Sequence, residues 1–250
     1  MIVKVCVNGA RGAEEHPRLA TDTSVLAEEA RAAVAAGAAA VHVHPKGREG
    51  RDSLAAEAVA AVVEAVRTAC PGVPVGVTTG AWAAPEPRER LEAVRSWSVL
   101  PDFASVNWHE DGADAVAQVL LDRGVGVEAG IWHTAGLDAW VASPLRSRCL
   151  RVLVELPDIG DVDEVGRRAS SLVSAVGRYE PRVPVLLHGE GASAWPALML
   201  AIELGLDTRI GLEDTLTLPD GRVTSGNAEL VDVAWALIRG GPAGRPGRVG

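Results

Sequence analysis

The sequence predicts an α/β fold, specifically a single (β/α)8 TIM barrel. Eight short apolar runs alternate with eight stretches of helical character, which is the order that such a barrel requires. An open doubly wound sheet rarely reaches eight units in a chain of 250 residues. In addition, no GxGxxG motif follows the first expected strand, which argues against a dinucleotide-binding sheet.

The expected strands are short, apolar and rich in β-branched residues. The first of them stops at Asn8 and Gly9, a pair that is typical of a turn. Along the chain, strands are expected at residues 2–7, 40–44, 73–77, 103–106, 124–128, 150–156, 183–187 and 208–212.

The stretches between the strands have helical composition. The first is rich in alanine, carries Glu28 and Glu29 in its body and ends at Gly37, and the second has Ser53 as its candidate N-cap. Helices are expected at residues 24–36, 53–70, 87–97, 113–123, 135–142, 162–176, 193–204 and 227–238. No linker separates two domains, so residues 1–239 are expected to form one catalytic barrel. Residues 240–250 are rich in Gly, Pro and Arg and are expected to be a flexible tail.

The composition limits the class of protein. With 48% hydrophobic residues, the chain can bury a full-sized core. A net charge of −9 argues against nucleic acid as the main partner, because phosphate binding needs a basic face. Cys6, Cys70 and Cys149 are odd in number and widely spaced, which suits free thiols in a reducing cytosol. Neither a signal peptide nor a membrane span is expected, so the sequence indicates a cytoplasmic enzyme.

The ends of the expected strands are where chemistry should be found, since TIM barrels carry their active sites at the C-terminal ends of the strands. Polar or charged side chains stand at all eight ends. In chain order they are Asn8; His42 and His44; Thr78 and Thr79; Ser105 and Asn107; Glu128; Glu155; His188; and Glu213 and Asp214.

Three of these residues form a candidate metal site. His42 and His44 are two residues apart in a strand, so their side chains point to the same face. Strands one, two and eight become neighbours when the barrel closes, which brings Glu213 within reach. Two imidazoles and a carboxylate suit Zn2+ as a Lewis acid and also match non-haem iron; zinc is preferred because no feature indicates redox chemistry. Alone, the His-x-His motif also fits a structural or hydrogen-bonded histidine pair, and the Glu213-Asp214 motif also fits a solvated loop. The joint placement of the two motifs at neighbouring strand ends favours a metal site.

The other strand ends leave alternatives open. Arg209 lies in an expected strand and needs a partner, because a buried unpaired guanidinium is costly; Asp214 is the obvious one, in a pair that can serve structure or catalysis. The turn at Thr78 and Thr79 suits a carboxylate or carbonyl ligand, but it also fits a simple strand-ending turn. Glu128 and Glu155 each follow an apolar strand. Either position suits an acid/base group and equally suits a charged residue on the rim of the barrel.

Several motifs together resemble a known family. They are VHVHP at 41–45, TTG at 78–80, SVN at 105–107, RIGLED at 209–214 and SGNAELV at 225–231. With these motifs the chain resembles the β-keto acid cleavage enzymes, typified by the 3-keto-5-aminohexanoate cleavage enzyme. The similarity runs from residue 3 to about residue 237. The His-x-His and Arg-x-x-x-Glu-Asp signatures are specific in combination, whereas the threonine turn alone is not.

The resemblance implies a zinc-dependent barrel, commonly a homotetramer, that condenses a β-keto acid with acetyl-CoA and releases acetoacetate and a new acyl-CoA thioester. By position, His42, His44 and Glu213 look like the zinc ligands, and Arg209 and Asp214 look like a dyad that helps to remove the substrate α-proton. The resemblance further points to a catalytic role for Glu128 and to substrate contacts from Asn8, Arg11, Thr78, Thr79, Ser105 and Asn107.

The chain departs from the family pattern in three places. Arg11 stands where the prototype carries a glutamate that contacts the far end of the substrate, which argues against an amino-bearing substrate; we expect Arg11 to favour an anionic or strongly polar distal group. After the fifth strand the prototype has two alternating glutamates, whereas this chain keeps Glu128 and has Gly130 at the second position. His188 and Glu190 have no place in the family pattern and are candidate pocket residues.

Two other functions are weaker alternatives. A metal-dependent hydrolase of the amidohydrolase type also uses His-x-His in a barrel, but it carries the pair on strand one and adds histidines from strands five and six. Here the pair is on strand two, and those later strands end in Glu128 and Glu155. A non-catalytic sensor of metal or keto acid would not need a base such as Asp214 beside Arg209.

Overall fold

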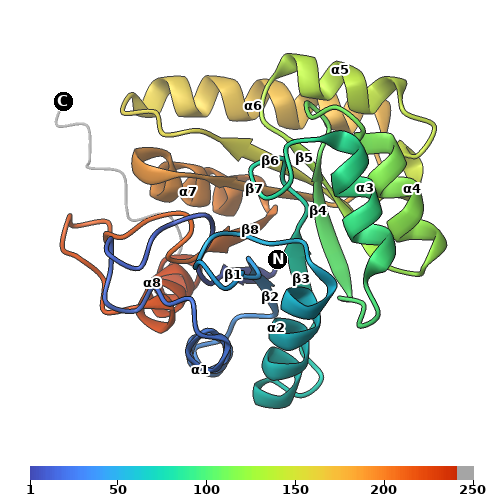
Figure 1. Ribbon diagram of the computed structural model, residues 1–250. Coiled ribbons are helices and arrows are strands. Elements are labelled where there is room, and N and C mark those ends of the chain that lie inside the picture. Colours follow the sequence, from blue (N-terminus) through green and yellow to red (C-terminus); the bar gives the residue numbers. More distant parts are fainter. Residues whose placement is uncertain (241–250) are drawn as a thin grey trace, which may run out of the picture.

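A computed structural model, which describes residues 1–240, shows eight parallel strands closed into a barrel in the order β1 to β8 (Figure 1). The strands are β1 Val3–Cys6, β2 Ala40–Val43, β3 Val75–Thr78, β4 Phe103–Asn107, β5 Gly126–Ile131, β6 Arg151–Leu156, β7 Val185–Gly189 and β8 Asp207–Ile210. The expected (β/α)8 TIM barrel is confirmed.

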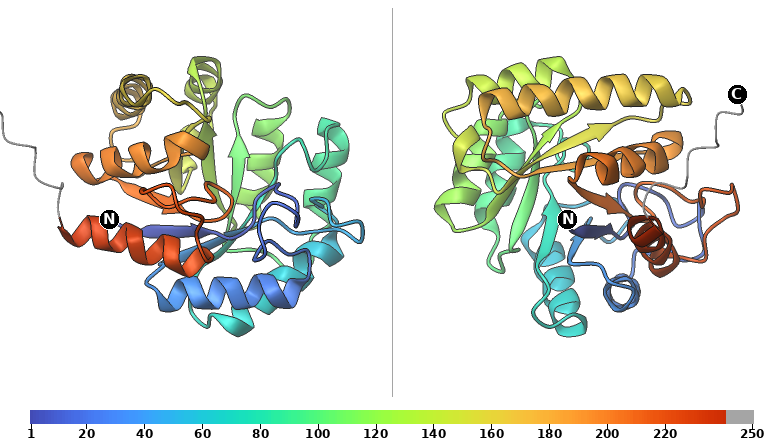
Figure 2. Two further views of the ribbon diagram at one scale, coloured as in Figure 1. Left: turned by 90° about the vertical axis from the view of Figure 1, so that its left-hand side faces the viewer. Right: turned by 180° about the vertical axis from the view of Figure 1, so that it is seen from behind.

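Eight α-helices alternate with the strands and pack on the outside of the barrel (Figure 2). They are α1 Thr23–Ala35, α2 Ala56–Ala69, α3 Pro87–Ser96, α4 Ala113–Asp122, α5 Thr134–Ala142, α6 Val162–Tyr179, α7 Ala194–Leu204 and α8 Asn227–Gly240, with short 3-10 helices η1 Arg146–Arg148 and η2 Gly191–Ser193. Of the expected tail at residues 240–250, Gly240 is the last residue of α8, and residues 241–250 lie outside the described residues. Among residues 1–240, no helix has the length and apolar character needed to cross a membrane.

The barrel closes where the beginning and the end of the chain meet. β1 pairs with β2 on one side and with β8 on the other. The first and last helices lie side by side (Figure 1), and the Trp235 indole N–H donates to the Gly37 carbonyl at 2.9 Å. This closure brings residues that are about 170 positions apart in the sequence to one end of the barrel.

The strands form because their residues suit full burial. In β1, β2 and β3 every residue is buried, and half of the residues are valines, as expected for parallel strands covered by helices on the outside and by side chains within. The helices end by ordinary means: α7, for example, stops at Gly205 in the left-handed conformation (φ 67°). The expected N-cap of the second helix is wrong, because α2 begins at Ala56 and Ser53 instead accepts a hydrogen bond from the Ala55 amide.

Glu128 lies deeper in the barrel than the sequence indicated. We expected the fifth strand to end there, but β5 continues to Ile131, so Glu128 is in the interior of the strand. Its carboxylate is fully buried and pairs with Lys4 Nζ at 2.5 Å and with Arg151 Nε at 3.3 Å. Lys4 also lies over the Phe103 ring, 5.4 Å from its centroid. The expected position of Glu128 at the catalytic end of the barrel is therefore wrong, and its role is in the barrel core.

We predict that Lys4→Ala lowers the free energy of unfolding by about 3–5 kcal/mol, because it removes the nearest cation from a carboxylate that stays buried. Chemical denaturation measures this loss. The double variant Lys4→Met/Glu128→Leu should recover most of it, and Arg88→Ala on the exposed face of α3 should change stability by less than about 0.5 kcal/mol. Equal stability of Lys4→Ala and wild type would contradict the prediction.

Candidate metal centre and catalytic cavity

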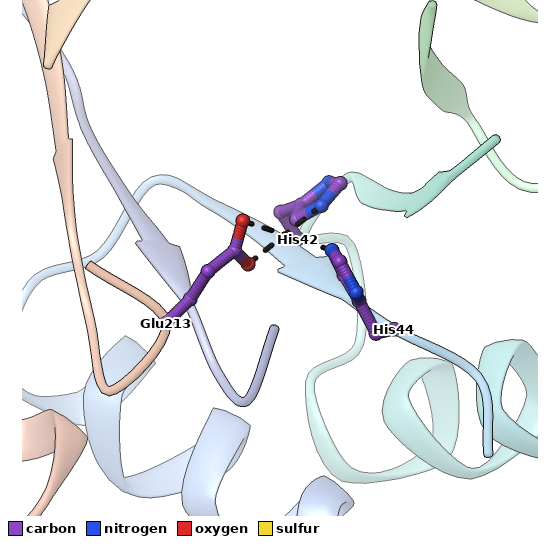
Figure 3. A group of neighbouring side chains, drawn as sticks. All are labelled: His42, His44 and Glu213. Carbon is purple, nitrogen blue, oxygen red and sulfur yellow. Dashed lines mark ion pairs between the residues drawn. The ribbon is translucent and has the colours of Figure 1, made fainter. Parts of the chain in front are cut away.

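His42, His44 and Glu213 come together at the C-terminal end of the barrel (Figure 3). His42 is in β2, His44 follows that strand directly, and Glu213 follows β8. His42 Nε2 lies 3.8 Å from Glu213 Oε2, and His44 Nε2 lies 3.6 Å from Glu213 Oε1. The three residues can each offer one ligand atom, all within 4.8 Å of one another.

Two glycines make this arrangement sterically feasible. A Cβ on Gly211 would lie 2.0 Å from the Cys6 carbonyl oxygen, so only glycine lets the chain after β8 pass this close to β1. The Glu213 amide then donates to the same Cys6 carbonyl at 3.2 Å. Gly9 has a φ of +57°, and a Cβ there would lie 2.5 Å from Glu213 Cγ. The loop after β1 therefore leaves room for the Glu213 side chain.

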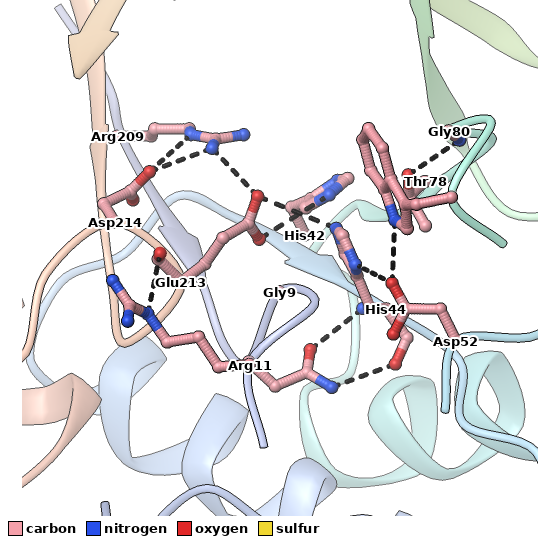
Figure 4. Close-up of polar contacts among 12 residues, drawn as sticks. Gly9, Arg11, His42, His44, Asp52, Thr78, Gly80, Arg209, Glu213 and Asp214 are labelled. Atoms are coloured by element: carbon pink, nitrogen blue, oxygen red, sulfur yellow. Dashed lines mark hydrogen bonds and ion pairs between the residues drawn. The ribbon is translucent and has the colours of Figure 1, made fainter. Parts of the chain in front are cut away.

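His44 is oriented by a second layer of contacts (Figure 4). Its Nδ1 lies 2.6 Å from Asp52 Oδ2, which leaves Nε2 to face Glu213. Asp52 is itself held by Lys46 Nζ at 2.6 Å and by the Trp82 indole N–H at 2.9 Å, and the Trp82 ring stacks 5.9 Å from the His44 ring. Asn8 accepts from the His44 amide and donates to its carbonyl, both at 2.9 Å. A carboxylate on the remote nitrogen of a histidine is the usual support of a metal ligand.

The donor set fits a divalent metal ion. The separations of 3.6 and 3.8 Å are close to the roughly 3.3 Å that bonds of about 2.0–2.1 Å at tetrahedral angles produce. Glu213 Oε2 is buried and has no hydrogen-bond partner within residues 1–240. Burial opposes ionisation of Glu213, but the Arg209 guanidinium and the two histidines hold its pKa well below the usual value, so the carboxylate is charged.

The two histidines differ in their electrostatics. Burial lowers the pKa of His42 well below its usual value, which keeps that imidazole neutral and ready to donate a lone pair. Burial also acts to lower the pKa of His44, but the Glu213 carboxylate and the hydrogen bond with Asp52 outweigh it and raise the pKa to about 9. A metal ion at this site therefore takes the place of a proton on His44.

Arg209 links the ligands to the interior. Its Nη2 donates to Glu213 Oε1 at 2.9 Å, and its Nε and Nη2 both donate to Asp214 Oδ1, at 3.0 and 2.9 Å. Asp214 is fully buried behind Arg209 (Figure 4). The expected pairing of Arg209 with Asp214 is present in the structure.

A cavity of about 370 Å³ opens in front of the candidate ligands. It is lined by Ala10, Arg11, Glu15, His42, His44, Thr78, Trp82, Ser105, Asn107, Trp132, Leu153, Glu155, Glu190, Arg209 and Glu213. Of the expected substrate contacts, Arg11, Thr78, Ser105 and Asn107 are on this wall.

Two expected substrate contacts do not line the cavity. Asn8 is buried and both ends of its amide hold the backbone of His44, so it supports a candidate ligand. Thr79 is buried and donates its hydroxyl to the Ser105 carbonyl at 2.7 Å, so it joins the ends of β3 and β4. Both side chains help to position other residues, and their expected contact with substrate stays a prediction.

Asp52 and Glu15 were not found by sequence reasoning. Both lie in loops: Asp52 follows His44 by eight residues, and Glu15 follows Arg11 by four. The loop that carries Asp52 turns back on itself through the bridge between Lys46 and Asp52. Glu15 lies four residues after Arg11 and accepts from its Nη1 at 2.7 Å. A charge pair of this spacing is the one signal in the sequence that could have indicated it.

Glu155, His188 and Glu190 lie at or just after the C-terminal ends of β6 and β7. Glu155 and His188 are paired in register on β6 and β7, with His188 Nε2 3.3 Å from Glu155 Oε2. On its other side, His188 Nδ1 lies 3.6 Å from Asp214 Oδ1. Glu190 follows two residues later and lines the cavity, as does Glu155.

Comparison with known proteins identifies the family of this chain. A model of the beta-keto acid cleavage enzyme family matches residues 1–243. The chain belongs to that family. The 3-keto-5-aminohexanoate cleavage enzyme of Acetoanaerobium sticklandii is 22% identical over 260 residues, covering 98% of this chain and 93% of the relative. The enzyme of the same name from Fusobacterium nucleatum subsp. nucleatum is 23% identical over 253 residues, covering 96% and 91%.

Solved structures share the fold. The binary complex of ObcA with oxaloacetate superimposes with a TM-score of 0.72 at 19% identity; the match covers 90% of this chain but only 64% of the ObcA chain. The carboxyl transferase domain of Rhizobium etli pyruvate carboxylase matches with a TM-score of 0.59 at 13% identity, covering 95% of this chain and 47% of that one. As a family member, the protein is a β-keto acid cleavage enzyme, as the sequence motifs indicated.

We predict that Asp52→Asn weakens binding of Zn2+ about 10–100-fold, because the amide no longer orients His44 and no longer supports its basicity. His42→Ala, which removes a donor, should cost more. Competition with a chromophoric chelator measures both affinities. Asp220→Asn, which changes an exposed carboxylate paired with Arg222, is the matched control and should bind as wild type does. Unchanged affinity in Asp52→Asn would contradict the assignment of His44 as a ligand.

Proposed function

We propose that this enzyme condenses a β-keto acid with acetyl-CoA and releases acetoacetate and a new acyl-CoA thioester, with Zn2+ held by His42, His44 and Glu213. The observation that carries the proposal is the group of three donors at the floor of a cavity, in a chain that belongs to the β-keto acid cleavage family. When bound there, zinc supplies Lewis-acid polarisation of a ketone, which acidifies the neighbouring CH2 group. Nothing in the donor set calls for redox chemistry, which favours zinc over iron.

Thr78 and Ser105 form the polar wall that we assign to the substrate carboxylate. They are register partners on β3 and β4, so their side chains lie next to each other at the mouth of the barrel. The Thr78 hydroxyl accepts from the Gly80 amide at 3.0 Å, which leaves its own hydrogen to donate into the cavity. Asn107, on the same wall, is already engaged, since it donates to Glu110 and accepts from the Trp132 indole.

Arg209 supplies positive charge where the enolate develops. Burial acts to lower its pKa, but Asp214 and the other nearby acids raise it well above the usual value, so the guanidinium keeps its proton. Asp214 fixes the direction of Arg209 and does not itself line the cavity. That Arg209 and Asp214 act together as a dyad that helps to remove the substrate α-proton stays a prediction. We assign Asp214 to the orientation of Arg209.

Arg11 is the residue that we assign to the distal end of the substrate. It lines the cavity, donates from Nε to the Glu213 carbonyl at 3.2 Å and pairs with Glu15 through Nη1. Its Nη2 has no such partner within the described residues. An anionic distal group can accept from this guanidinium, whereas an ammonium group would be repelled by it. We therefore propose a β-keto acid with a second acidic or strongly polar group.

The alternatives fit less well. The histidine pair is on β2, and no histidine ends β5 or β6, which is not the arrangement expected of an amidohydrolase. A non-catalytic sensor is not supported by membership of an enzyme family. The expected homotetramer and cytoplasmic location stay predictions.

We predict that the zinc-loaded enzyme forms acetoacetate when it is given acetyl-CoA and a β-keto acid. Incubation with neutral, dicarboxylic and amino-bearing β-keto acids, followed by an enzymatic assay for acetoacetate, tests this directly. Removal of metal with a chelator should abolish turnover, and added Zn2+ should restore it. No acetoacetate from any of these substrates with fully loaded protein would contradict the proposed function.

We predict that Arg11→Gln raises KM for a dicarboxylic β-keto acid about 10-fold or more, since a charge-assisted hydrogen bond contributes about 1.5–3 kcal/mol. KM for a neutral substrate should change little. Steady-state kinetics on both substrates gives the comparison, with Arg88→Gln on exposed α3 as the control. If wild type prefers an amino-bearing substrate to a dicarboxylic one, the assignment of Arg11 is wrong.

A further inference from the structure

Trp82 contacts the supporting residues of the candidate metal centre as well as the cavity. It lies in the loop between β3 and α3, lines the cavity and is 45% exposed. Its indole N–H donates to Asp52 Oδ2 at 2.9 Å, and its ring is stacked on the His44 ring with an interplanar angle of 12°. One side chain of the cavity wall thus touches both a candidate ligand and the carboxylate that orients this ligand.

The Asp52 carboxylate is held at both of its oxygens. Asp52 Oδ2 lies 2.6 Å from His44 Nδ1 and also accepts from the Trp82 indole, whereas Oδ1 accepts from Lys46 Nζ at 2.6 Å (Figure 4). The Asp52 side chain is only 5% exposed. A carboxylate in such a position cannot rotate without losing a hydrogen bond that water does not easily replace. The direction in which Asp52 holds His44 therefore depends on the other donors.

These donors come from loops that follow three neighbouring strands. Lys46 and Asp52 belong to the loop after β2, and Lys46 Nζ also donates to the Gly9 carbonyl in the loop after β1 at 2.8 Å. Trp82 supplies the contact from the loop after β3. Without the Trp82 indole, the contacts that hold Asp52 would come only from the loops after β1 and β2.

Trp82 is itself held in place by its surroundings. A Cβ on Gly80 would lie 2.2 Å from Trp82 Cζ2, so glycine there lets the indole lie directly against the turn after β3. The Ala81 amide donates to Glu110 Oε2 at 3.0 Å, which ties this turn to the loop after β4. The Trp132 ring lies beside the Trp82 ring, with 6.5 Å between their centroids. The indole N–H is therefore presented to Asp52 from a supported position.

We propose that Trp82 is a positioning residue of the candidate metal centre, in which its indole N–H fixes the Asp52 carboxylate that orients His44. Trp82 does not bind the ion itself and acts through Asp52. The partners of a ligating histidine contribute to the affinity for the metal because they set the direction of its ring. This inference rests on the proposed function in one respect, namely that His42, His44 and Glu213 hold Zn2+.

The affinity for Zn2+ tests the proposal, measured by competition with a chromophoric chelator. Trp82→Phe keeps a ring beside His44 but removes the N–H, and it should weaken binding about 3–10-fold, less than a change at Asp52 because the contact is one step further from the ion. Trp82→Ala also removes the ring and should cost more. In the background of Asp52→Ala, Trp82→Phe should change the affinity less than about 2-fold, because the group through which Trp82 acts is gone.

The kinetics should show the same route. At limiting zinc, half-maximal activity of Trp82→Phe should need about 3–10-fold more free Zn2+ than wild type, in line with the loss of affinity. With zinc in excess, kcat should return to the wild-type value, and KM for the β-keto acid should change less than about 2-fold. A residue that only shaped the cavity would instead change KM at saturating zinc and leave the affinity for zinc unchanged.

Trp195→Phe on α7 is the matched control. It removes an indole N–H that donates to the Thr217 carbonyl at 2.8 Å, and Trp195 does not line the cavity, so this variant should bind zinc as wild type does. Circular dichroism checks that each variant is folded before zinc is added.

Two results would overturn the role of Trp82. One is wild-type affinity for zinc in Trp82→Phe, and the other is an equal loss from Trp82→Phe with and without Asp52. If wild type binds no zinc, the proposed metal centre fails and this inference fails with it. If wild type binds zinc but forms no acetoacetate, the proposed reaction alone has failed, and the affinities still decide the role of Trp82.

Discussion

The catalytic end of this barrel depends on the Glu213 carboxylate, which meets two imidazoles that lie about 170 residues earlier in the chain. That meeting requires the barrel to close between β1 and β8, since β1 pairs with β2 on one side and β8 on the other. It also requires glycine at Gly211, where the chain passes directly against the Cys6 carbonyl. Arg209 then fixes one oxygen of Glu213, and the other oxygen has no hydrogen-bond partner among residues 1–240. The site is thus a consequence of closure, and a barrel with a different order of strands would not have it.

The sequence predicted this part of the site because it follows from spacing within one strand and from the order of the strands. His42 and His44 are two residues apart in a strand, which places their side chains on one face. The order of strands in a barrel then places Glu213 beside them. The fold followed from the same kind of information, namely the alternation of apolar runs and helical stretches. These inferences needed no knowledge of side-chain partners.

What could not be predicted depends on where a strand ends and on which polar group a side chain meets. Glu128 follows an apolar run, so it looked like a strand end, but the pairing of β5 with β6 continues to Ile131 and places it among the core charges. Asn8 and Thr79 do lie at strand ends, but their polar atoms form hydrogen bonds with the backbone of His44 and Ser105. Asp52 belongs to a loop, and its contact with His44 has no signature in spacing. Residue type and position alone do not distinguish a side chain that faces the cavity from one that holds its neighbour.

Different strands contribute residues of different chemical type to the cavity. β2 and β8 carry the candidate ligands, β3 and β4 carry hydroxyl groups, and β6 and β7 carry Glu155 and His188 in register, with Glu190 just beyond. Arg11 reaches in from the loop after β1 and is not part of the barrel frame. This division explains why the acids can be so numerous. Glu155, Glu190, Glu213 and Asp214 would repel one another at close range, but the Arg209 guanidinium and His188 lie next to these carboxylates, and a metal ion held at the candidate site would offset further charge. Because Arg11, the proposed distal contact, lies on a loop, the group recognised there could change without disturbing the residues that the barrel strands position.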